Sequence, residues 1–279
     1  METSLQNHNL SSWTLYSVNA TNISTDKSPC SWYGVHCNHA GSVNSINITG
    51  VSLKGTLQNF SFSQFPHLAC LILSNNELFG TIPPHIGNLS KLKYLDLSSN
   101  QFSRKIPSEI SLLTNLNFLY FSENQLSGSI PEEFGLLTER GYLDLSANRL
   151  SKTIPKNLGD LLKLYYLNLG NNQISEEIPV ELGKLGQLLE LDLSQNLLQR
   201  EILSEICSLK SLEKLNLSHN RFSGLIPSCF EKMNGLSSID ISYNELRDSI
   251  PNSKAFKNGP IEALQGNQGL CDDAIGLPS

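Results

Sequence analysis

The chain has 279 residues and a formal net charge of −6, and charged residues make up 16% of it. The acidic balance argues against a nucleic-acid partner. The length suits one or two ordinary domains, and the charged fraction is well below the roughly 25% that is typical of soluble domains.

Residues 1–42 are predicted to form an N-terminal cap. Their two cysteines, Cys30 and Cys37, are close in sequence and are expected to pair as a disulfide. The first residues, METSLQNHNLSSW, contain no apolar segment of the kind found in a signal peptide. No run of about 18 apolar residues occurs anywhere in the chain, so we expect this segment itself to make no membrane contact.

Seven N-x-S/T sequons fit a glycosylated secretory surface, although chance alone would place several in a chain rich in Asn and Ser. They lie at Asn9, Asn19, Asn22, Asn47, Asn59, Asn88 and Asn216.

A 24-residue repeat begins at Leu68 and recurs eight times without an insertion. Apolar residues occupy its positions 1, 4, 6, 11, 15, 19 and 22, and position 9 is asparagine in every unit. Of the 64 positions so defined, 61 fit, and the exceptions are Arg140, Lys254 and Lys257. We place eight regular repeats at residues 68–259 and a looser first repeat at 43–67, where Val51 replaces the asparagine.

Energetics require the repeats to stack. Burying seven apolar side chains contributes roughly 10 to 20 kcal/mol per unit, whereas ordering its residues costs about 1 to 2 kcal/mol each. A single unit is therefore unstable alone, and stacked units form a solenoid whose short strands pair with their neighbours. The asparagine is interpreted as structural, because its amide can satisfy backbone groups that cost about 1 to 3 kcal/mol when buried without a partner.

Three segments resemble a known family. The unit LKYLDLSSNQFSRKIPSEISLLTN (92–115) resembles the plant-type leucine-rich repeat, and this resemblance covers residues 43 to about 259. PCSWYGVHC (29–37) is similar to the N-terminal cap of plant receptor-like kinases and receptor-like proteins, and LQGNQGLC (264–271) to the segment after their last repeat. The resemblance implies an α/β solenoid of horseshoe form, with short parallel strands on the concave face and 3-10 or helical turns on the convex face.

The same resemblance implies a function. Ectodomains of this family lie on the extracellular face of the plasma membrane or in the apoplast and bind peptides, glycans or proteins on the concave face. A second receptor often docks near the C-terminal repeats. We expect a peptide or protein ligand and a possible co-receptor, with no cofactor. The alternatives are a secreted inhibitor of cell-wall hydrolases, similar to polygalacturonase inhibitors, and a truncated gene product that does not signal.

The ends of the chain differ from whole receptors of this family, which carry a signal peptide, a membrane helix and often a kinase. We expect an ectodomain trimmed at both ends. In the family, the cysteine after GLC usually has a partner a few residues further on, and none follows Cys271. Residues 260–279 are therefore interpreted as an incomplete C-terminal cap.

The remaining cysteines are constrained by the repeat. Cys207 and Cys229 lie on the convex side of adjacent units, so a disulfide of normal Cα separation is feasible. Cys70 and Cys271 lie at least seven strand spacings apart, roughly 34 Å, and cannot pair with each other.

One enzyme-like pattern occurs. Position 5 holds aspartate on alternate strands, with backbones about 9.6 Å apart, which approaches the separation of the carboxylates in an inverting glycosidase. However, LDLS is ordinary repeat consensus, and an open sheet offers no burial to raise a carboxyl pKa. The chain has no Cys-x-x-Cys, no His-x-x-x-His and no glycine-rich phosphate loop. We expect no catalysis and no metal site. The aspartates are Asp96, Asp144, Asp192 and Asp240.

Position 3, in the middle of each exposed strand face, holds four consecutive aromatic residues followed by polar ones. Tyr120 at position 5 and Tyr165 at position 2 widen the aromatic row. The rings are interpreted either as cross-strand stabilisation or as a recognition surface. The candidate ligand-binding residues are Tyr94, Asp96, Phe118, Tyr120, Tyr142, Asp144, Tyr166, Asn168, Glu190, Asp192 and Lys214.

Three further departures from the family pattern matter. Glycine at position 13 survives at Gly80, Gly128 and Gly224 but is replaced elsewhere by Arg104, Lys152, Glu176, Arg200 and Asp248. This replacement is either drift on a solvated edge or a lateral ridge for a partner protein. Arg140 occupies a core leucine position, where we expect it to extend to solvent and to make its unit the weakest. No arginine occupies position 5 or 7, so the Arg-x-Arg carboxylate site of certain peptide receptors of the family is not expected.

Overall fold

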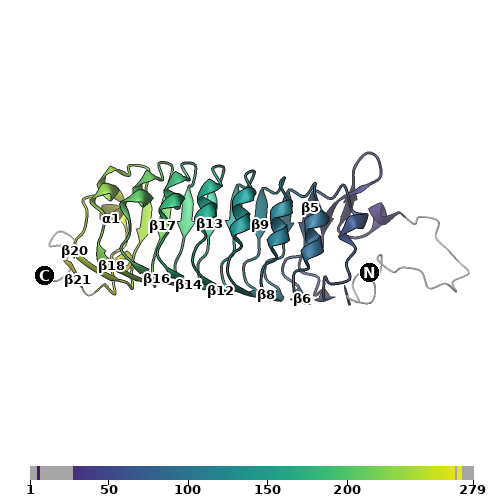
Figure 1. The fold of residues 1–279 in the computed structure, drawn as a ribbon, viewed down its shortest axis with the longest axis horizontal. Coiled ribbons are helices and arrows are strands. Elements are labelled where there is room, and N and C mark those ends of the chain that lie inside the picture. Colours follow the sequence, from purple (N-terminus) through teal and green to yellow (C-terminus); the bar gives the residue numbers. More distant parts are fainter. Residues whose placement is uncertain (1–4, 7–27, 268, 272–279) are drawn as a thin grey trace, which may run out of the picture.

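The computed structural model describes residues 5–6, 28–267 and 269–271. The repeats stack side by side along one long axis, so that the first and the last repeat lie at opposite ends (Figure 1). This stacking of parallel strands confirms the predicted solenoid. None of the helices in the described ranges is long and apolar enough to cross a membrane.

In the described part of the chain, the main sheet has ten strands, and all pair in parallel except β2 with β3. The strands at position 3 to 5 of each repeat build it, so every repeat adds one strand. Its outward face is the face that the sequence predicts to be concave. The strands are β2 (Val35–Cys37), β3 (Val43–Asn47), β5 (Cys70–Ile72), β7 (Tyr94–Asp96), β9 (Phe118–Tyr120), β11 (Tyr142–Asp144), β13 (Tyr166–Asn168), β15 (Glu190–Asp192), β17 (Lys214–Asn216) and β19 (Ser238–Asp240).

A second sheet, the lateral sheet, runs along one edge of the solenoid (Figure 1). The sequence analysis did not predict it, because a strand such as Gln101–Arg104 buries a single core residue and shows no apolar alternation. Its strands are β1 (Leu5–Gln6), β4 (Lys54–Gly55), β6 (Glu77–Gly80), β8 (Gln101–Arg104), β10 (Gln125–Gly128), β12 (Arg149–Lys152), β14 (Gln173–Glu176), β16 (Leu197–Arg200), β18 (Arg221–Leu225), β20 (Glu245–Ser249) and β21 (Gly269–Cys271).

Short 3-10 helices return the chain on the convex side, as predicted. Proline precedes most of them, since a residue without an N–H fits the start of a helix. They are η2 (Pro29–Ser31), η3 (Phe62–Gln64), η4 (Pro84–Asn88), η5 (Ser108–Leu112), η6 (Glu132–Leu136), η7 (Lys156–Asp160), η8 (Val180–Lys184), η9 (Ser204–Ser208), η10 (Ser228–Lys232) and η11 (Ile261–Ala263).

The eighth repeat departs from this pattern. Its convex segment is an α-helix, α1 (Lys254–Asn258), in which Ala255 and Phe256 are buried and Lys254 and Lys257 are exposed. The change of helix type shifts the buried positions, which explains why both lysines violate the repeat pattern.

Asparagine at position 9 links neighbouring repeats, as the sequence predicts. In the case of Asn196, Oδ1 accepts from the Ile174 amide of the preceding repeat at 2.9 Å. Its Nδ2 donates to the carbonyls of Leu169 (3.0 Å) in the preceding repeat and Leu193 (3.2 Å) in its own repeat. Each asparagine therefore satisfies backbone groups of two repeats at once.

This asparagine ladder continues beyond the eighth repeat, which the sequence analysis missed. Asn267 accepts from the Leu246 amide at 3.1 Å and donates to the carbonyls of Ile241 (2.9 Å) and Leu264 (3.0 Å). Residues 260–271 therefore act as a partial repeat, and β21 extends the lateral sheet.

Arg140 is fully buried, and its guanidinium nitrogens have no hydrogen-bond partner. The expectation that it extends to solvent is wrong, because the same position in the flanking repeats holds buried Leu116 and Leu164. The guanidinium carbon lies 5.5 Å from the ring centroid of Phe134. Burial lowers the pKa of Arg140 to about 9, so the side chain still carries its charge at neutral pH.

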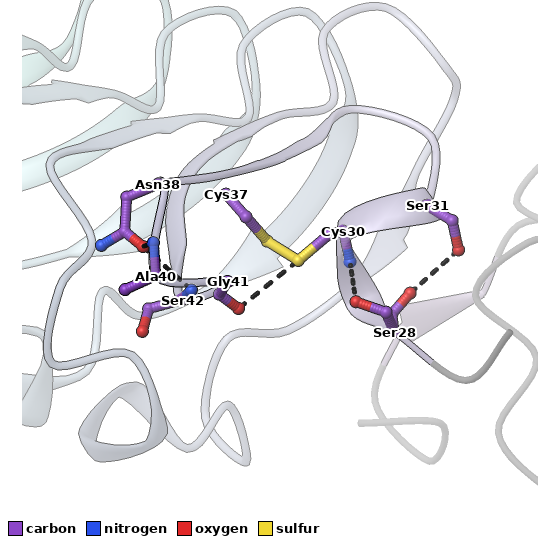
Figure 2. Close-up of a disulfide and its surroundings, with 8 residues drawn as sticks. All are labelled: Ser28, Cys30, Ser31, Cys37, Asn38, Ala40, Gly41 and Ser42. Atoms are coloured by element: carbon purple, nitrogen blue, oxygen red, sulfur yellow. Dashed lines mark hydrogen bonds between the residues drawn. A yellow bond between two sulfur atoms is a disulfide. The ribbon is translucent and has the colours of Figure 1, made fainter.

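Both predicted disulfides are present. Cys30 of η2 bonds to Cys37 of β2 with a Cα separation of 5.5 Å (Figure 2). Cys207 and Cys229 join η9 to η10 with a Cα separation of 6.1 Å. Cys70 is not in a disulfide, whereas the side chain of Cys271 lies outside the described residues.

The N-terminal disulfide closes the first exposed end of the core. Replacing Cys30 and Cys37 with serine is expected to lower the free energy of unfolding by about 2 to 4 kcal/mol, because the unfolded chain gains conformational freedom. Urea denaturation followed by circular dichroism measures the change. Cys70→Ser is the control, since Cys70 forms no disulfide. Free thiols at Cys30 and Cys37 in the folded chain, purified without reductant, would contradict the assignment.

Candidate ligand-binding face

Four aromatic side chains lie in register across the main sheet. Tyr94, Phe118, Tyr142 and Tyr166 face one another on strands β7, β9, β11 and β13. Their ring centroids are separated by 5.2, 4.9 and 6.1 Å in that order. Tyr120 joins them, with its ring centroid 5.6 Å from that of Tyr94. These five residues are called the aromatic strip, and the sequence prediction that they lie together is confirmed.

The strip is half-buried because its rings cover one another. The interplanar angle is 15° between Phe118 and Tyr142 and 29° between Tyr142 and Tyr166. Ring faces therefore pack against neighbouring rings. Stacking of this kind stabilises adjacent strands, and it also fixes the side chains before any ligand arrives.

Three tyrosine hydroxyls of the strip, those of Tyr94, Tyr120 and Tyr166, remain protonated. Burial raises the pKa of Tyr120 to about 12. Burial is also the main reason that the pKa values of Tyr94 and Tyr166 are raised. At neutral pH these hydroxyls are hydrogen-bond donors as well as acceptors. Tyr165, which the sequence placed beside the strip, is 41% exposed.

The aspartates at position 5 are held by serines. In each of four repeats, one carboxylate oxygen accepts from the amide and the hydroxyl of the serine two residues further on, and the hydroxyl contacts are 2.6 to 2.7 Å long. The pairs are Asp96 with Ser98, Asp144 with Ser146, Asp192 with Ser194, and Asp240 with Ser242. These contacts fix the carboxylates and leave one oxygen of each outside the pair.

Asp144 differs from the sequence-based expectation. Burial beside the strip raises its pKa, although the two hydrogen bonds from Ser146 oppose the shift. The expectation that the open sheet buries no carboxyl group is therefore wrong at this position.

The polar end of the face is more internally paired than the sequence suggests. Lys214 Nζ lies 2.7 Å from Glu190 Oε1, and this hydrogen bond is the main reason that the pKa of Lys214 is raised. Asn168 Nδ2 donates to the Tyr166 hydroxyl at 3.2 Å. The sequence showed which side chains share the face, but not which of them bind one another.

The described sequons differ in accessibility. Asn47, Asn59 and Asn88 are exposed. Asn216 is half-buried, and its amide nitrogen, the atom to which a glycan attaches, donates to Asp192 Oδ2 at 3.3 Å. Use of any sequon stays a prediction. The sequons at Asn9, Asn19 and Asn22 lie outside the described residues.

One aromatic pair escaped the sequence analysis. His219 and Tyr243 stack with ring centroids 4.3 Å apart and an interplanar angle of 15°. Both occupy position 8 of their repeats, where the six preceding repeats have no aromatic residue. Within the described residues, no group of His, Cys, Asp or Glu side chains has the arrangement of a metal site.

The family is shown by direct comparison. The profile described as Leucine rich repeat matches residues 66–126, 141–198 and 208–253, which together exceed half of the chain. The profile described as Leucine rich repeat N-terminal domain matches residues 1–38. The chain therefore belongs to the leucine-rich repeat family.

Within that family the chain is similar to plant receptor ectodomains. A probable leucine-rich repeat receptor-like protein kinase of Arabidopsis thaliana is 47% identical over 79 residues, which is 28% of this chain and 7% of that protein. The Arabidopsis receptor kinase HAESA, solved in complex with the peptide hormone IDA and the co-receptor SERK1, is 33% identical with a TM-score of 0.74. That match covers 81% of this chain and 42% of the HAESA chain. The chain thus spans less than half of each of these receptors.

The fold also serves another purpose. A plant ice-binding protein is 27% identical with a TM-score of 0.75, and the match covers 89% of this chain and 88% of that protein. Fold alone therefore does not decide the function, which must be argued from the face of the main sheet.

Proposed function

We propose that this chain is the extracellular ligand-recognition domain of a plant receptor-like kinase or receptor-like protein, and that it binds a peptide or protein on the outward, concave face of the main sheet. The observation that carries the proposal is the aromatic strip, which lies in register on four neighbouring strands. The likeness to HAESA, which was solved with a peptide hormone and a co-receptor, supports a peptide ligand and a co-receptor for this chain. The place of action is then the cell surface or the apoplast.

The geometry of the strip suits an extended ligand. Stacked rings lose little side-chain freedom on binding, so the entropic cost of forming an interface is small. The ring edges and the hydroxyls of Tyr94, Tyr120 and Tyr142 offer apolar contact and hydrogen bonds to a peptide backbone. Binding rather than catalysis is proposed, because hydrogen bonds from serines fix the position 5 carboxylates.

The strip gives the ligand a direction. Apolar ligand side chains lie on the aromatic strip, and polar or basic groups reach the region of Asp144, Asn168 and Asp192. Lys214 already neutralises Glu190, so Asp144 and Asp192 supply the attraction for a basic group. Losing such a carboxylate is expected to change mainly the association rate and its dependence on salt.

The test removes two central rings. Peptides selected on the secreted chain from a displayed peptide library serve as probes, and their affinities are measured by biolayer interferometry. Phe118→Ala with Tyr142→Ala is expected to weaken binding by roughly thirtyfold or more, since a central aromatic anchor typically contributes about 2 kcal/mol or more. Lys156→Ala on the convex side is the matched control.

The outcome separates the two interpretations of the strip. Circular dichroism establishes that the double variant is folded. A folded double variant that binds the selected peptides as well as Lys156→Ala does would show that the rings serve to stabilise the sheet. Selection of no peptide, together with inhibition of a cell-wall hydrolase, would favour the inhibitor alternative.

A further inference from the structure

Position 13 of each repeat lies in a strand of the lateral sheet. The residue at this position adopts a left-handed backbone conformation in all eight repeats. All eight φ angles lie between 69° and 84°, a region that glycine occupies freely and that strains other residues. Glycine is present in three repeats. The other five residues are Arg104, Lys152, Glu176, Arg200 and Asp248.

All five residues that replace glycine are charged and exposed. No neutral residue replaces glycine at these exposed positions. Asparagine, which tolerates this conformation better than most residues, occupies none of them. This composition favours the lateral ridge over drift on a solvated edge.

The charges are separated along the edge. A basic end, in repeats 2 to 4, contains Arg104, Lys105 and Lys152, and an acidic end, in repeats 5 and 6, contains Glu176, Glu177 and Glu201. Together with Arg200 they are called the lateral ridge. Arg200 Nη1 lies 3.5 Å from Glu177 Oε2, which pairs these two charges.

The other ridge charges have no ionic partner. In the described ranges, no ion pair involves Arg104, Lys105, Lys152, Glu176 or Glu201. Glu176 accepts a hydrogen bond from the neutral amide of Gln199 at 3.1 Å. Most charges of the basic end and of the acidic end therefore have no opposite charge beside them within the described part of the chain. The basic end of one copy is complementary to the acidic end of another.

We propose that a second copy of this chain binds along the lateral ridge in antiparallel orientation. A two-fold axis between β12 and β14 places Lys152 of each copy opposite Glu176 of the other, because a two-fold interface pairs each residue reciprocally. Lys105 lies over Gly128 and Glu201 over Gly224. The same axis therefore brings Glu201 toward Arg104 of the second copy, whereas Lys105 meets Arg200, whose charge is already paired with Glu177.

The association is weak and dependent on salt. Exposed ion pairs contribute little individually and are screened by salt, and a narrow ridge buries less area than a permanent dimer needs. The dimer is therefore a transient one, and it leaves the aromatic strip free, because the strip belongs to the main sheet. The proposal does not depend on the identity of any ligand.

The experiment is sedimentation velocity of the secreted chain over a range of protein and salt concentrations. The native chain is expected to dimerise as its concentration rises at low salt and to return to a monomer at high salt. Lys152→Glu and Glu176→Lys are each expected to weaken dimerisation by about tenfold or more, since each places like charges opposite one another. Lys156→Glu on the convex side is the control and is expected to dimerise like the native chain.

Charge exchange supplies the decisive comparison. An equimolar mixture of Lys152→Glu and Glu176→Lys is expected to form a heterodimer, and the variant that carries both changes is expected to recover the homodimer. The substitutions at Lys152 and Glu176 keep a charged, non-glycine residue in the left-handed conformation, so the strain of the backbone is the same in the native chain and in the variants. Melting curves establish that each variant is folded. A native chain that is monomeric throughout, a dimer that resists salt, or a mixture that fails to associate would overturn the proposal.

Discussion

Replacing Arg140 with leucine is expected to raise the free energy of unfolding by about 3 to 5 kcal/mol, because an uncompensated buried charge carries a penalty of this size. The position is built for leucine, since Leu116 and Leu164 are fully buried at the same place in the flanking repeats. The new side chain adds apolar contact without leaving a polar atom unpaired. Chemical denaturation of both chains at neutral pH measures the difference.

The pH dependence of this gain has a defined sign. Burial lowers the pKa of Arg140 to about 9, so above that pH the unfolded chain binds the proton more tightly than the folded chain does. Stability linked to this group therefore rises with pH above about 9, and the advantage of Arg140→Leu narrows there. Arg149→Leu, at an exposed position, is the control. An Arg140→Leu variant no more stable than the native chain would show that the guanidinium finds compensation in solution.

Replacing Asn196 with alanine is expected to lower the free energy of unfolding by about 1 to 3 kcal/mol, because the buried Ile174 amide is left without its acceptor. The carbonyls of Leu169 and Leu193 also lose the Asn196 donor, but each keeps a bond from a neighbouring asparagine, Asn172 and Asn220 respectively. Native-state hydrogen exchange is the sharpest measurement, since protection of the Ile174 amide is expected to fall with the global stability. Gln173→Ala, at an exposed position of the same region, is expected to change neither. An unchanged Ile174 exchange rate would contradict the role of the ladder.

The repeat period accounts for most of what the sequence predicted about the fold. A fixed 24-residue spacing sets which side chains face the core, and it aligns the columns of neighbouring strands, so that the core and the aromatic strip follow directly. The disulfide between Cys207 and Cys229 follows from the same alignment. Prediction failed where a residue departs from its column, as with Arg140, or where a local change of helix type moves the column, as with Lys254.

The lateral sheet and the pairing on the polar end could not be predicted for a different reason. A strand that buries one residue in four produces no alternation, and its backbone hydrogen bonds leave no trace in the sequence. Columns also do not reveal which side chains bind each other, so the bond between Lys214 and Glu190 appeared only in the structure. The ligand-binding role of the strip stays a prediction, since stacking alone accounts for the rings.

The asparagine ladder makes the solenoid asymmetric along its length. Each asparagine donates to a carbonyl of the preceding repeat and accepts from an amide of that repeat, so a repeat is completed by the one that follows it. At the far end this contribution comes from Asn267, which binds the Leu246 amide and the Ile241 carbonyl. A chain that stopped short of Asn267 would leave the Leu246 amide unpaired, whereas the Ile241 carbonyl would keep its bond from Asn244. Unravelling would then begin at the C-terminal end and proceed one repeat at a time, because each repeat that is lost leaves the one before it without its asparagine.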